Sequence, residues 1–281
     1  MARLVRIQTI PSQRMTSSPP PKITWISSYP KSGNTWVRFM LYAAIYGPPE
    51  RSIDINRRIA DIHRKSELDT PDPALPLLCK THFELTDAHP ELANTKGAIH
   101  IIRNPRDVLL SALNYHRLTG VTDQQLPDHA YAQAFIAHGG DPMYKQLGFG
   151  TWASHARSWR STERFPVLAL RYEDLKADPR AALVTMLDFL KLDLDDTRID
   201  NAIKASAFDA MRALEIREKK QAPDQDLSKR LFVGDKRATS KGVYFMNSGS
   251  TNQKLDALAP GLDERFNTKL KPQLDEFGYA D

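Results

Sequence analysis

The sequence lacks most features of secreted, metal-binding or membrane-spanning proteins. Its 281 residues include one cysteine, Cys79, which excludes an intramolecular disulfide framework and a zinc site built on several cysteines. No apolar stretch approaches the roughly 20 residues that a helix needs to cross a bilayer. Clusters of His, Asp or Glu at metal-ligand spacing are also missing. We therefore expect a cytoplasmic protein that uses neither a membrane anchor nor a metal ion.

Acidic residues are absent from the first 49 positions, which hold six basic residues. The chain has 39 basic and 34 acidic residues in all, so positions 50–281 hold 33 basic against 34 acidic residues and are nearly neutral. No basic stripe with interleaved aromatic residues recurs there, so the charge does not indicate nucleic-acid binding. Residues 1–21 are arginine-rich, then serine- and proline-rich, which predicts a disordered basic tail rather than a targeting peptide.

The remaining residues, 22–281, alternate short β-rich runs with helical patterns. We expect strands at 23–28, 75–81, 97–103 and 165–174. We expect helices at 35–46, 105–117, 179–191 and 263–277, two of which start at a proline. Strands separated by helices predict a single α/β domain with a central parallel sheet flanked by helices. Two polar stretches, 119–150 and 219–253, are predicted to be long mobile loops.

The stretch "SSYPKSGNTWVRFM", residues 27–40, joins the first predicted strand to the first predicted helix. The free N–H groups and the dipole at a helix start favour an anion, and Gly33 allows a ligand to approach the backbone closely. This is not the nucleotide P-loop G-x-x-x-x-G-K-[ST], because Lys31 precedes Gly33 and the first glycine is absent. The stretch therefore predicts an anion site of another kind.

The octapeptide "YPKSGNTW" resembles the 5′-phosphosulfate loop of sulfotransferases, whose usual form is YPKSGTTW. Further segments similar to that family follow in its order: "CKTHF" at 79–83, "RNPRDVLLS" at 103–111, "RYEDLKADP" at 171–179 and "SAFDAMR" at 206–212. The chain thus resembles the small-molecule sulfotransferases, which transfer a sulfuryl group from 3′-phosphoadenosine 5′-phosphosulfate (PAPS) to a hydroxyl or amine. The resemblance implies their P-loop-nucleotide-hydrolase-like fold and the product adenosine 3′,5′-bisphosphate (PAP).

The resemblance also implies two anion sites for this donor. The first would hold the phosphosulfate with Lys31, Ser32, Gly33, Asn34, Thr35 and Trp36. The second would hold the 3′-phosphate with Arg103 and Ser111. Tyr172 and Ser206 would hydrogen-bond the nucleotide. Trp36 and Phe208 would enclose the adenine, although Trp36 also suits a plain hydrophobic core.

His82 is the predicted general base, because an imidazole with its usual pKa near 6.5 can take a proton at neutral pH. It directly follows a predicted strand and lies beside Lys80, which by resemblance would contact the transferred sulfonate. Lys31 would stabilise the charge that grows on the leaving oxygen. The other seven histidines have no comparable setting in the sequence.

Two segments depart from the family pattern. Asn34 stands where the family usually has threonine, and we expect its amide still to donate to the anion. Near the C-terminus the family has R-K-G and then G-D-W, whereas this chain reads "KRATSKGVYFMNSGS". Lys241 and Gly242 match, but Ser240 replaces the arginine, and Arg237 is a candidate to take its place. Which of these residues completes the 3′-phosphate site stays open.

We therefore predict a PAPS-dependent sulfotransferase of the cytoplasm, monomeric or homodimeric, with a small hydroxylated acceptor and no nucleic-acid, membrane or metal partner. The alternatives are a sulfotransferase-like protein that binds nucleotide without turnover, a magnesium-dependent P-loop kinase, and a nucleic-acid binder. The acceptor is not identified. Its wall is expected to include Phe83 and parts of 54–76 and 119–150, although the aromatic residues of 119–150 equally suit anchoring of that loop on the core.

Overall fold

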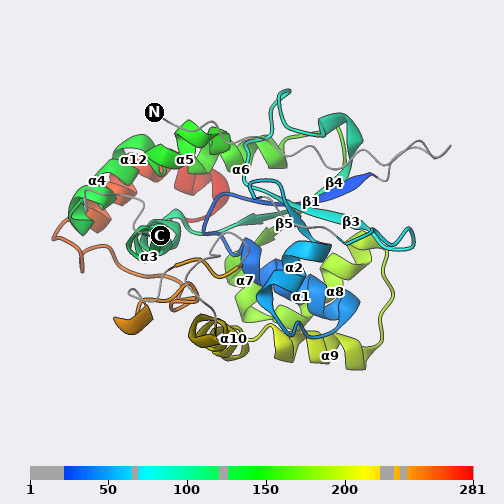
Figure 1. The fold of residues 1–281 in the computed structure, drawn as a ribbon. Coiled ribbons are helices and arrows are strands. Elements are labelled where there is room, and N and C mark those ends of the chain that lie inside the picture. The colour runs from blue at the N-terminus through cyan, green and yellow to red at the C-terminus, as the bar shows by residue number, and fades with distance from the viewer. Residues whose placement is uncertain (1–21, 65–68, 120–125, 222–230, 235–238, 281) are drawn as a thin grey trace.

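The computed structural model describes residues 22–64, 69–119, 126–221, 231–234 and 239–280. Its centre is a five-stranded sheet of order β2-β3-β1-β4-β5, in which every neighbouring pair is parallel. The strands are β1 (Ile23–Ser28), β2 (Ala60–Asp61), β3 (Leu77–Thr81), β4 (Thr95–Ile102) and β5 (Val167–Arg171). Helices cover both faces of the sheet (Figure 1), which confirms the predicted single α/β domain.

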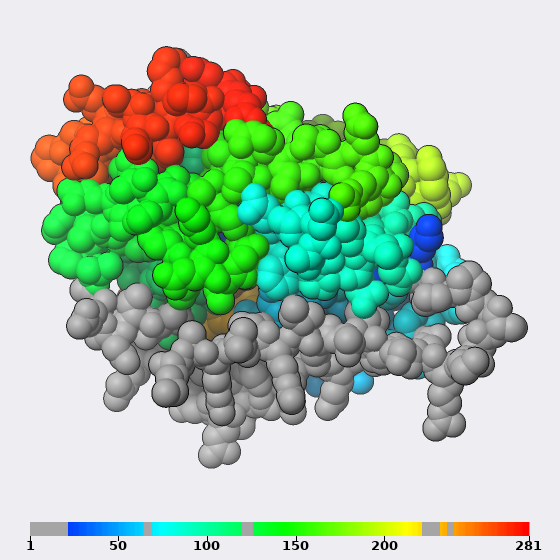
Figure 2. All heavy atoms as spheres, turned by 90° about the horizontal axis from the view of Figure 1, so that it is seen from above, coloured from blue at the N-terminus to red at the C-terminus, as the bar shows by residue number. Residues whose placement is uncertain are grey.

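The helices follow β1, β4 and β5 along the chain. They are α1 (Asn34–Tyr46), α2 (Ser52–Arg58), α3 (Pro105–Thr119), α4 (Asp128–His138), α5 (Pro142–Tyr144), α6 (Trp152–Arg160), α7 (Tyr172–Ala177), α8 (Pro179–Leu190), α9 (Asp196–Ala205), α10 (Phe208–Gln221) and α12 (Leu262–Phe277). A short 3-10 turn, η1 (Leu92–Asn94), precedes β4, and a π-helical turn, η2 (Lys145–Phe149), follows α5. Figure 2 shows α12, in orange and red, packed beside the green segment of α4–α6.

The central strand β1 is buried along its whole length, as expected for a strand with parallel neighbours and helices on both faces. Ile26 packs into a core formed with α1, α8 and α9. Trp25 points to the opposite face, where it packs with Trp159 of α6. Because side chains alternate along a strand, this one segment contributes to both layers of the core.

Two sequence predictions need correction. The stretch 119–150 is not a loop, because it contains α4, which buries Tyr131, Ala132, Phe135 and Ile136 in the core. The many polar residues of this stretch led us to predict a loop. Residues 172–174 do not extend the fourth predicted strand but begin α7. In the second predicted loop, 219–253, α10 continues to Gln221, while 222–230 and 235–238 lie outside the described residues. The predicted tail 1–21 lies outside them as well and stays a prediction.

Among the helices that the structure describes, none is long and apolar enough to cross a membrane.

Candidate active site

The carboxyl ends of β1, β3 and β4 open into a cavity of about 690 Å³, at the edge where parallel sheets bind ligands. Its wall brings together most of the residues predicted from the motifs. These are Lys31, Gly33, Asn34, Thr35, Trp36, Lys80, His82, Arg103, Ser111, Tyr172, Ser206 and Phe208. They come from five segments that are far apart in the sequence, so their convergence is a property of the fold.

Four predicted residues are not part of this wall. Ser32 is fully buried, and its hydroxyl has no hydrogen-bond partner among the residues that the structure describes. Lys241 and Gly242 lie in an exposed turn, closed by the bond from the Gly242 N–H to the Thr239 carbonyl, and do not reach the cavity. Arg237 lies outside the described residues.

The anion loop needs glycine at position 33 for two reasons. Gly33 has φ of 105°, in the left-handed region that favours glycine. A Cβ there would also lie 2.6 Å from the Tyr172 ring. Lys31 is itself left-handed, with φ of 71°, which costs energy for a residue with a side chain. The resulting tight loop brings the first turn of α1, with its free N–H groups, to the cavity wall.

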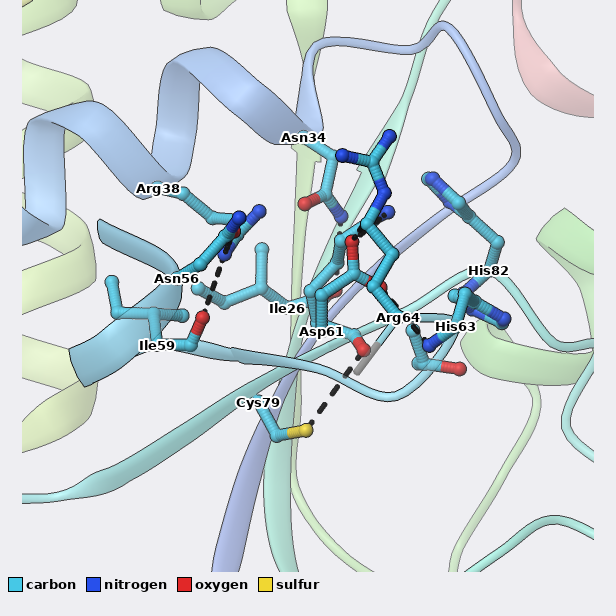
Figure 3. A network of polar contacts seen from close by, with 12 residues as sticks. Ile26, Asn34, Arg38, Asn56, Ile59, Asp61, His63, Arg64, Cys79 and His82 are labelled. Carbon is cyan, nitrogen blue, oxygen red and sulfur yellow. Dashed lines mark hydrogen bonds and ion pairs between the residues drawn. The ribbon is translucent and has the colours of Figure 1, made fainter. Parts of the chain in front are cut away.

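The Asn34 amide is committed to the protein rather than to the cavity. Its Nδ2 donates to the Ile26 carbonyl at 2.9 Å and to the Ser28 hydroxyl at 3.3 Å (Figure 3). These bonds tie the start of α1 to the end of β1. We expected this amide to donate to an anion, whereas the structure leaves the backbone N–H of Asn34 as the group that can do so.

Lys31 is held in an aromatic cage. Its Nζ lies 4.4 Å from the ring centroids of both Tyr115 and Phe245, which gives two cation–π contacts. Burial, with the nearby charges of Arg103 and Lys80, lowers the pKa of Lys31 to about 7. The ammonium group is therefore only partly charged at neutral pH until an anion arrives.

Arg103, at the carboxyl end of β4, is fixed by backbone carbonyls. Its guanidinium donates to the Lys31 carbonyl at 3.1 Å and to the Ser250 carbonyl at 2.7 Å. It also lies over the Tyr172 ring, 4.2 Å from the centroid. Trp36 meets the same tyrosine edge-on at 5.7 Å. These contacts build one end of the cavity from a cation and flat aromatic rings, a combination suited to a nucleotide phosphate and base.

His82, just after β3, is held as one tautomer. Its Nδ1 lies 2.7 Å from the Ser28 carbonyl, which can only accept, so Nδ1 carries the proton and Nε2 keeps its lone pair. The backbone N–H of His82 donates to Nε2 of His63 at 2.7 Å. Burial, with smaller contributions from Lys80 and His63, lowers the pKa of His82 well below its usual value. The imidazole is thus a neutral base at physiological pH.

An ion pair supports the lysine beside this base. The Lys80 Nζ lies 2.8 Å from the carboxylate of Asp61, a buried residue at the end of β2. Burial alone would raise the pKa of Asp61, but Lys80 and Arg38 outweigh it and hold that pKa far below its usual value. Arg38 is in turn bonded to the Asn56 side chain and the Ile59 carbonyl. Asp61 therefore orients Lys80 while remaining ionised.

The acceptor side of the wall agrees in part with the expected stretches. His63 and Arg64 come from 54–76, and Met143, Tyr144, Leu147 and Phe149 come from 119–150. Phe83, Tyr131 and Phe135 pack into the hydrophobic core instead. Within 54–76 the sequence singled out neither Asp61 nor His63, because β2 has only two residues and shows no periodicity.

A segment that we call the strap, residues 244–250, contributes Phe245, Met246, Asn247, Ser248 and Gly249 to the cavity wall. It lies within the predicted loop 219–253, but the sequence did not single it out. The carboxylate of Glu215, fully buried in α10, accepts the N–H groups of Phe245 at 2.7 Å and Met246 at 2.8 Å. Lys219 pairs with the same carboxylate at 2.6 Å. Lys176 holds the far end of the strap through the Gly249 carbonyl, also at 2.6 Å.

The cavity is strongly cationic, since its wall includes six cationic residues and, among the described residues, one carboxylate, Asp61. The cationic residues are Lys31, Arg38, Arg64, Lys80, Arg103 and Lys176. Within the described part of the chain no group of three or more His, Cys, Asp or Glu is placed to hold a metal ion. The arrangement suits a substrate with several negative charges.

An α/β fold with an anion loop, a cationic cavity and a neutral histidine beside it suits the binding and transfer of an anionic group. A family model described as a sulfotransferase domain matches residues 21–278. Since this match spans most of the chain, the protein belongs to the sulfotransferase family, and the resemblance noted in its motifs is confirmed.

Sulfotransferase 1A1 of Bos taurus is 29% identical over 201 residues, which cover 66% of this chain and 65% of that protein. The chain thus aligns with slightly less than two thirds of the bovine protein. Sulfotransferase 1C2 of Rattus norvegicus is 25% identical over 283 residues, which cover 94% of this chain and 86% of that protein.

Two solved structures share the fold. Retinol dehydratase, in complex with androsterone and the inactive cofactor PAP, has a TM-score of 0.65 at 17% identity, covering 90% of this chain and 81% of that one. Mouse sulfotransferase SULT7A1, complexed with PAP, has a TM-score of 0.59 at 18% identity, covering 93% and 90%. The predicted fold is therefore confirmed.

Proposed function

We propose that the protein transfers the sulfuryl group of PAPS to a hydroxyl or amine of a small-molecule acceptor, with His82 as the general base. The observation that carries this proposal is the tautomer of His82, whose Nδ1 is bonded to the Ser28 carbonyl. Its Nε2 keeps its lone pair, and His82 and Lys80 both line the cavity that the anion loop also lines. The PAP bound in structural relatives supports this choice of donor.

In this mechanism His82 Nε2 takes the proton of the acceptor hydroxyl as its oxygen attacks sulfur. The bond from sulfur to the bridging oxygen breaks, and its electron pair stays on the 5′-phosphate of the product PAP. Lys31 leaves its aromatic cage and donates to that oxygen, where negative charge grows. Lys80, oriented by Asp61, contacts the sulfonate as it is transferred.

The donor would lie with its 3′-phosphate on Arg103 and Ser111 and its adenine near Trp36, Tyr172 and Phe208. Ser206 is part of the same wall. Because Arg103 now donates to the Ser250 carbonyl, a bound phosphate would compete with the strap for this guanidinium. The cations would supply the positive charge, so we propose a reaction without metal, carried out by a cytoplasmic monomer or homodimer.

The first experiment is calorimetric titration with PAP, without metal, compared with AMP and with ATP plus magnesium. A preference for PAP would support the two-phosphate site, whereas a preference for magnesium-bound ATP would support a kinase instead. Turnover with PAPS and a panel of phenols and alcohols then separates an enzyme from a protein that only binds nucleotide.

His82→Ala should lower turnover about 10²–10⁴-fold while PAP binding stays within threefold of the unmodified protein. Loss of turnover and of PAP binding, together with loss of the folded state, would assign His82 a structural role.

A further inference from the structure

The turn after β2 directs a second cation toward the reacting end of the cavity. The Arg64 N–H donates to the Asp61 carbonyl at 3.0 Å, which closes the turn and brings His63 and Arg64 to the cavity wall. In the view of Figure 3 the Arg64 side chain rises between Asn34, at the start of α1, and His82. These are the anion loop and the base, between which the transferred group must lie.

The ion pair between Arg64 and Asp61 is long. The Arg64 Nε lies 3.8 Å from the Asp61 carboxylate, whereas the Lys80 Nζ lies 2.8 Å from the same oxygen. The stronger pair thus belongs to Lys80, whose charge is already offset by Asp61. Of the two cations here that pair with Asp61, Arg64 is the one held farther from its carboxylate.

The cations at the transfer point, Lys31, Lys80 and Arg64, differ in how fully they stay charged at neutral pH. Burial lowers the pKa of Lys31 to about 7 and that of Lys80 to about 8. An arginine guanidinium keeps its charge in proteins, and its planar donors match the oxygens of a tetrahedral anion in pairs. A nucleophilic oxygen that approaches an anionic sulfonate is repelled unless fixed positive charge offsets it.

We propose that Arg64 is a further catalytic residue, which binds the sulfonate oxygens of the donor together with Lys31 and Lys80. This rests on the proposed sulfuryl transfer. Arg64 lowers the barrier by offsetting the sulfonate charge and by holding the sulfur in line with the acceptor oxygen.

The test compares PAPS with PAP, because the two differ only in the sulfonate. We would make Arg64→Gln and, as the matched control, Arg58→Gln, since Arg58 is bonded to Asp69 and is not part of the cavity wall. Arg64→Gln should weaken PAPS binding about tenfold or lower kcat with a neutral phenol about 10²-fold, and PAP affinity should stay within threefold. Arg64→Lys should recover part of the loss, and Arg58→Gln should behave as the unmodified protein.

Three outcomes would overturn the inference. In the first, Arg64→Gln leaves PAPS affinity and kcat unchanged. In the second, PAP and PAPS affinity fall equally, which would mean that Arg64 shapes the anion loop. In the third, the loss is confined to carboxylate-bearing phenols and spares their amides, which would place Arg64 on the acceptor. If the unmodified protein neither binds PAP nor turns over PAPS, the proposed function itself fails.

Discussion

At the residue scale, burial determines the protonation of the two groups that would move protons and charge. His82 and Lys31 both have lowered pKa values, mainly because the charged form loses hydration in the cavity wall. For His82 the shift favours the proposed task, since a general base must be unprotonated. For Lys31 the shift weakens the charge that would bind the proposed donor, so we expect donor binding to raise this pKa.

The first prediction concerns the pH profile of the base. A histidine with its usual pKa would lose half of its basic form at about pH 6.5. Because the pKa of His82 lies well below that value, kcat/KM for the donor should still be near its plateau at pH 6.5 and fall only in more acidic buffer. Initial rates from pH 5 to 8 would measure this. A half-point at or above 6.5 would contradict a buried, neutral His82.

The second prediction concerns proton uptake by Lys31. Its pKa of about 7 in the free protein should rise when the anionic 5′-phosphate binds nearby. PAP affinity should therefore be highest below pH 7 and fall as the pH rises above it, by at most about tenfold per unit. Calorimetry in two buffers of different ionisation enthalpy would show proton uptake at pH 8. Lys31→Met should remove the protons that Lys31 takes up when PAP binds. If the variant takes up as many protons as the unmodified protein, Lys31 is not the group that is protonated.

At the scale of elements, α10 and the strap form one unit. The Glu215 carboxylate accepts two strap N–H groups and pairs with the buried Lys219. Through Phe245 the strap closes the cage around Lys31, and through Ser250 it accepts from Arg103. The position of the strap is thus linked to the two side chains predicted to bind the donor.

The third prediction is that Glu215→Ala loosens this unit. It leaves Lys219 as a buried unpaired charge, which should lower the free energy of unfolding by about 3–5 kcal/mol. PAP binding should weaken as well. The control is Glu218→Ala on the same helix, because Glu218 bonds to Ser52 and not to the strap.

Urea unfolding and PAP titration would measure both effects. The double variant Glu215→Leu with Lys219→Met removes the buried charges and should regain stability but not PAP affinity. Full recovery of PAP affinity in the double variant would show that the strap does not depend on Glu215 for binding.

At the scale of the whole molecule, burial affects five histidines. Their pKa values are all lowered, chiefly by desolvation, and they are His63, His82, His89, His100 and His155. Several lie together in the layer between β4 and α6, where the His100 and His155 rings are 5.4 Å apart. The folded protein therefore holds these imidazoles neutral.

The fourth prediction follows from proton linkage. Below the unfolded pKa of about 6.5 the unfolded chain binds protons that the folded chain does not, so stability should fall as the pH falls. Each histidine contributes a slope of up to about 1.4 kcal/mol per pH unit, until its folded pKa is reached. Urea unfolding at pH 7.5, 6.5 and 5.5 would measure the slope. His155→Phe should reduce the slope by one histidine's share, and equal stability at the three pH values would refute the account.

Two motifs with a local physical meaning converge on the same cavity. The anion loop follows β1, the "CKTHF" segment spans the end of β3, and both contribute residues to the cavity wall. Lys241 and Gly242 matched a motif yet lie outside the cavity wall, where Phe245 and Gly249 of the strap are found instead. A motif match of only two residues therefore did not predict where the chain runs in space. The helix α4 was not predicted because its apolar face is recognisable only from its packing against α3 and α12.

The sequence by itself determined the alternation of strands and helices, the anion loop with its obligatory Gly33, and the family. The alternation and the turn at Gly33 depend on backbone preferences of residues close in the chain, and the family depends on short motifs that are read directly from the sequence. The tertiary structure alone decided which His82 nitrogen carries the proton, how Asp61 orients Lys80, and that Arg64 and the strap line the cavity. Those features depend on burial and charge supplied by distant segments, and such contacts leave no periodic pattern in the sequence.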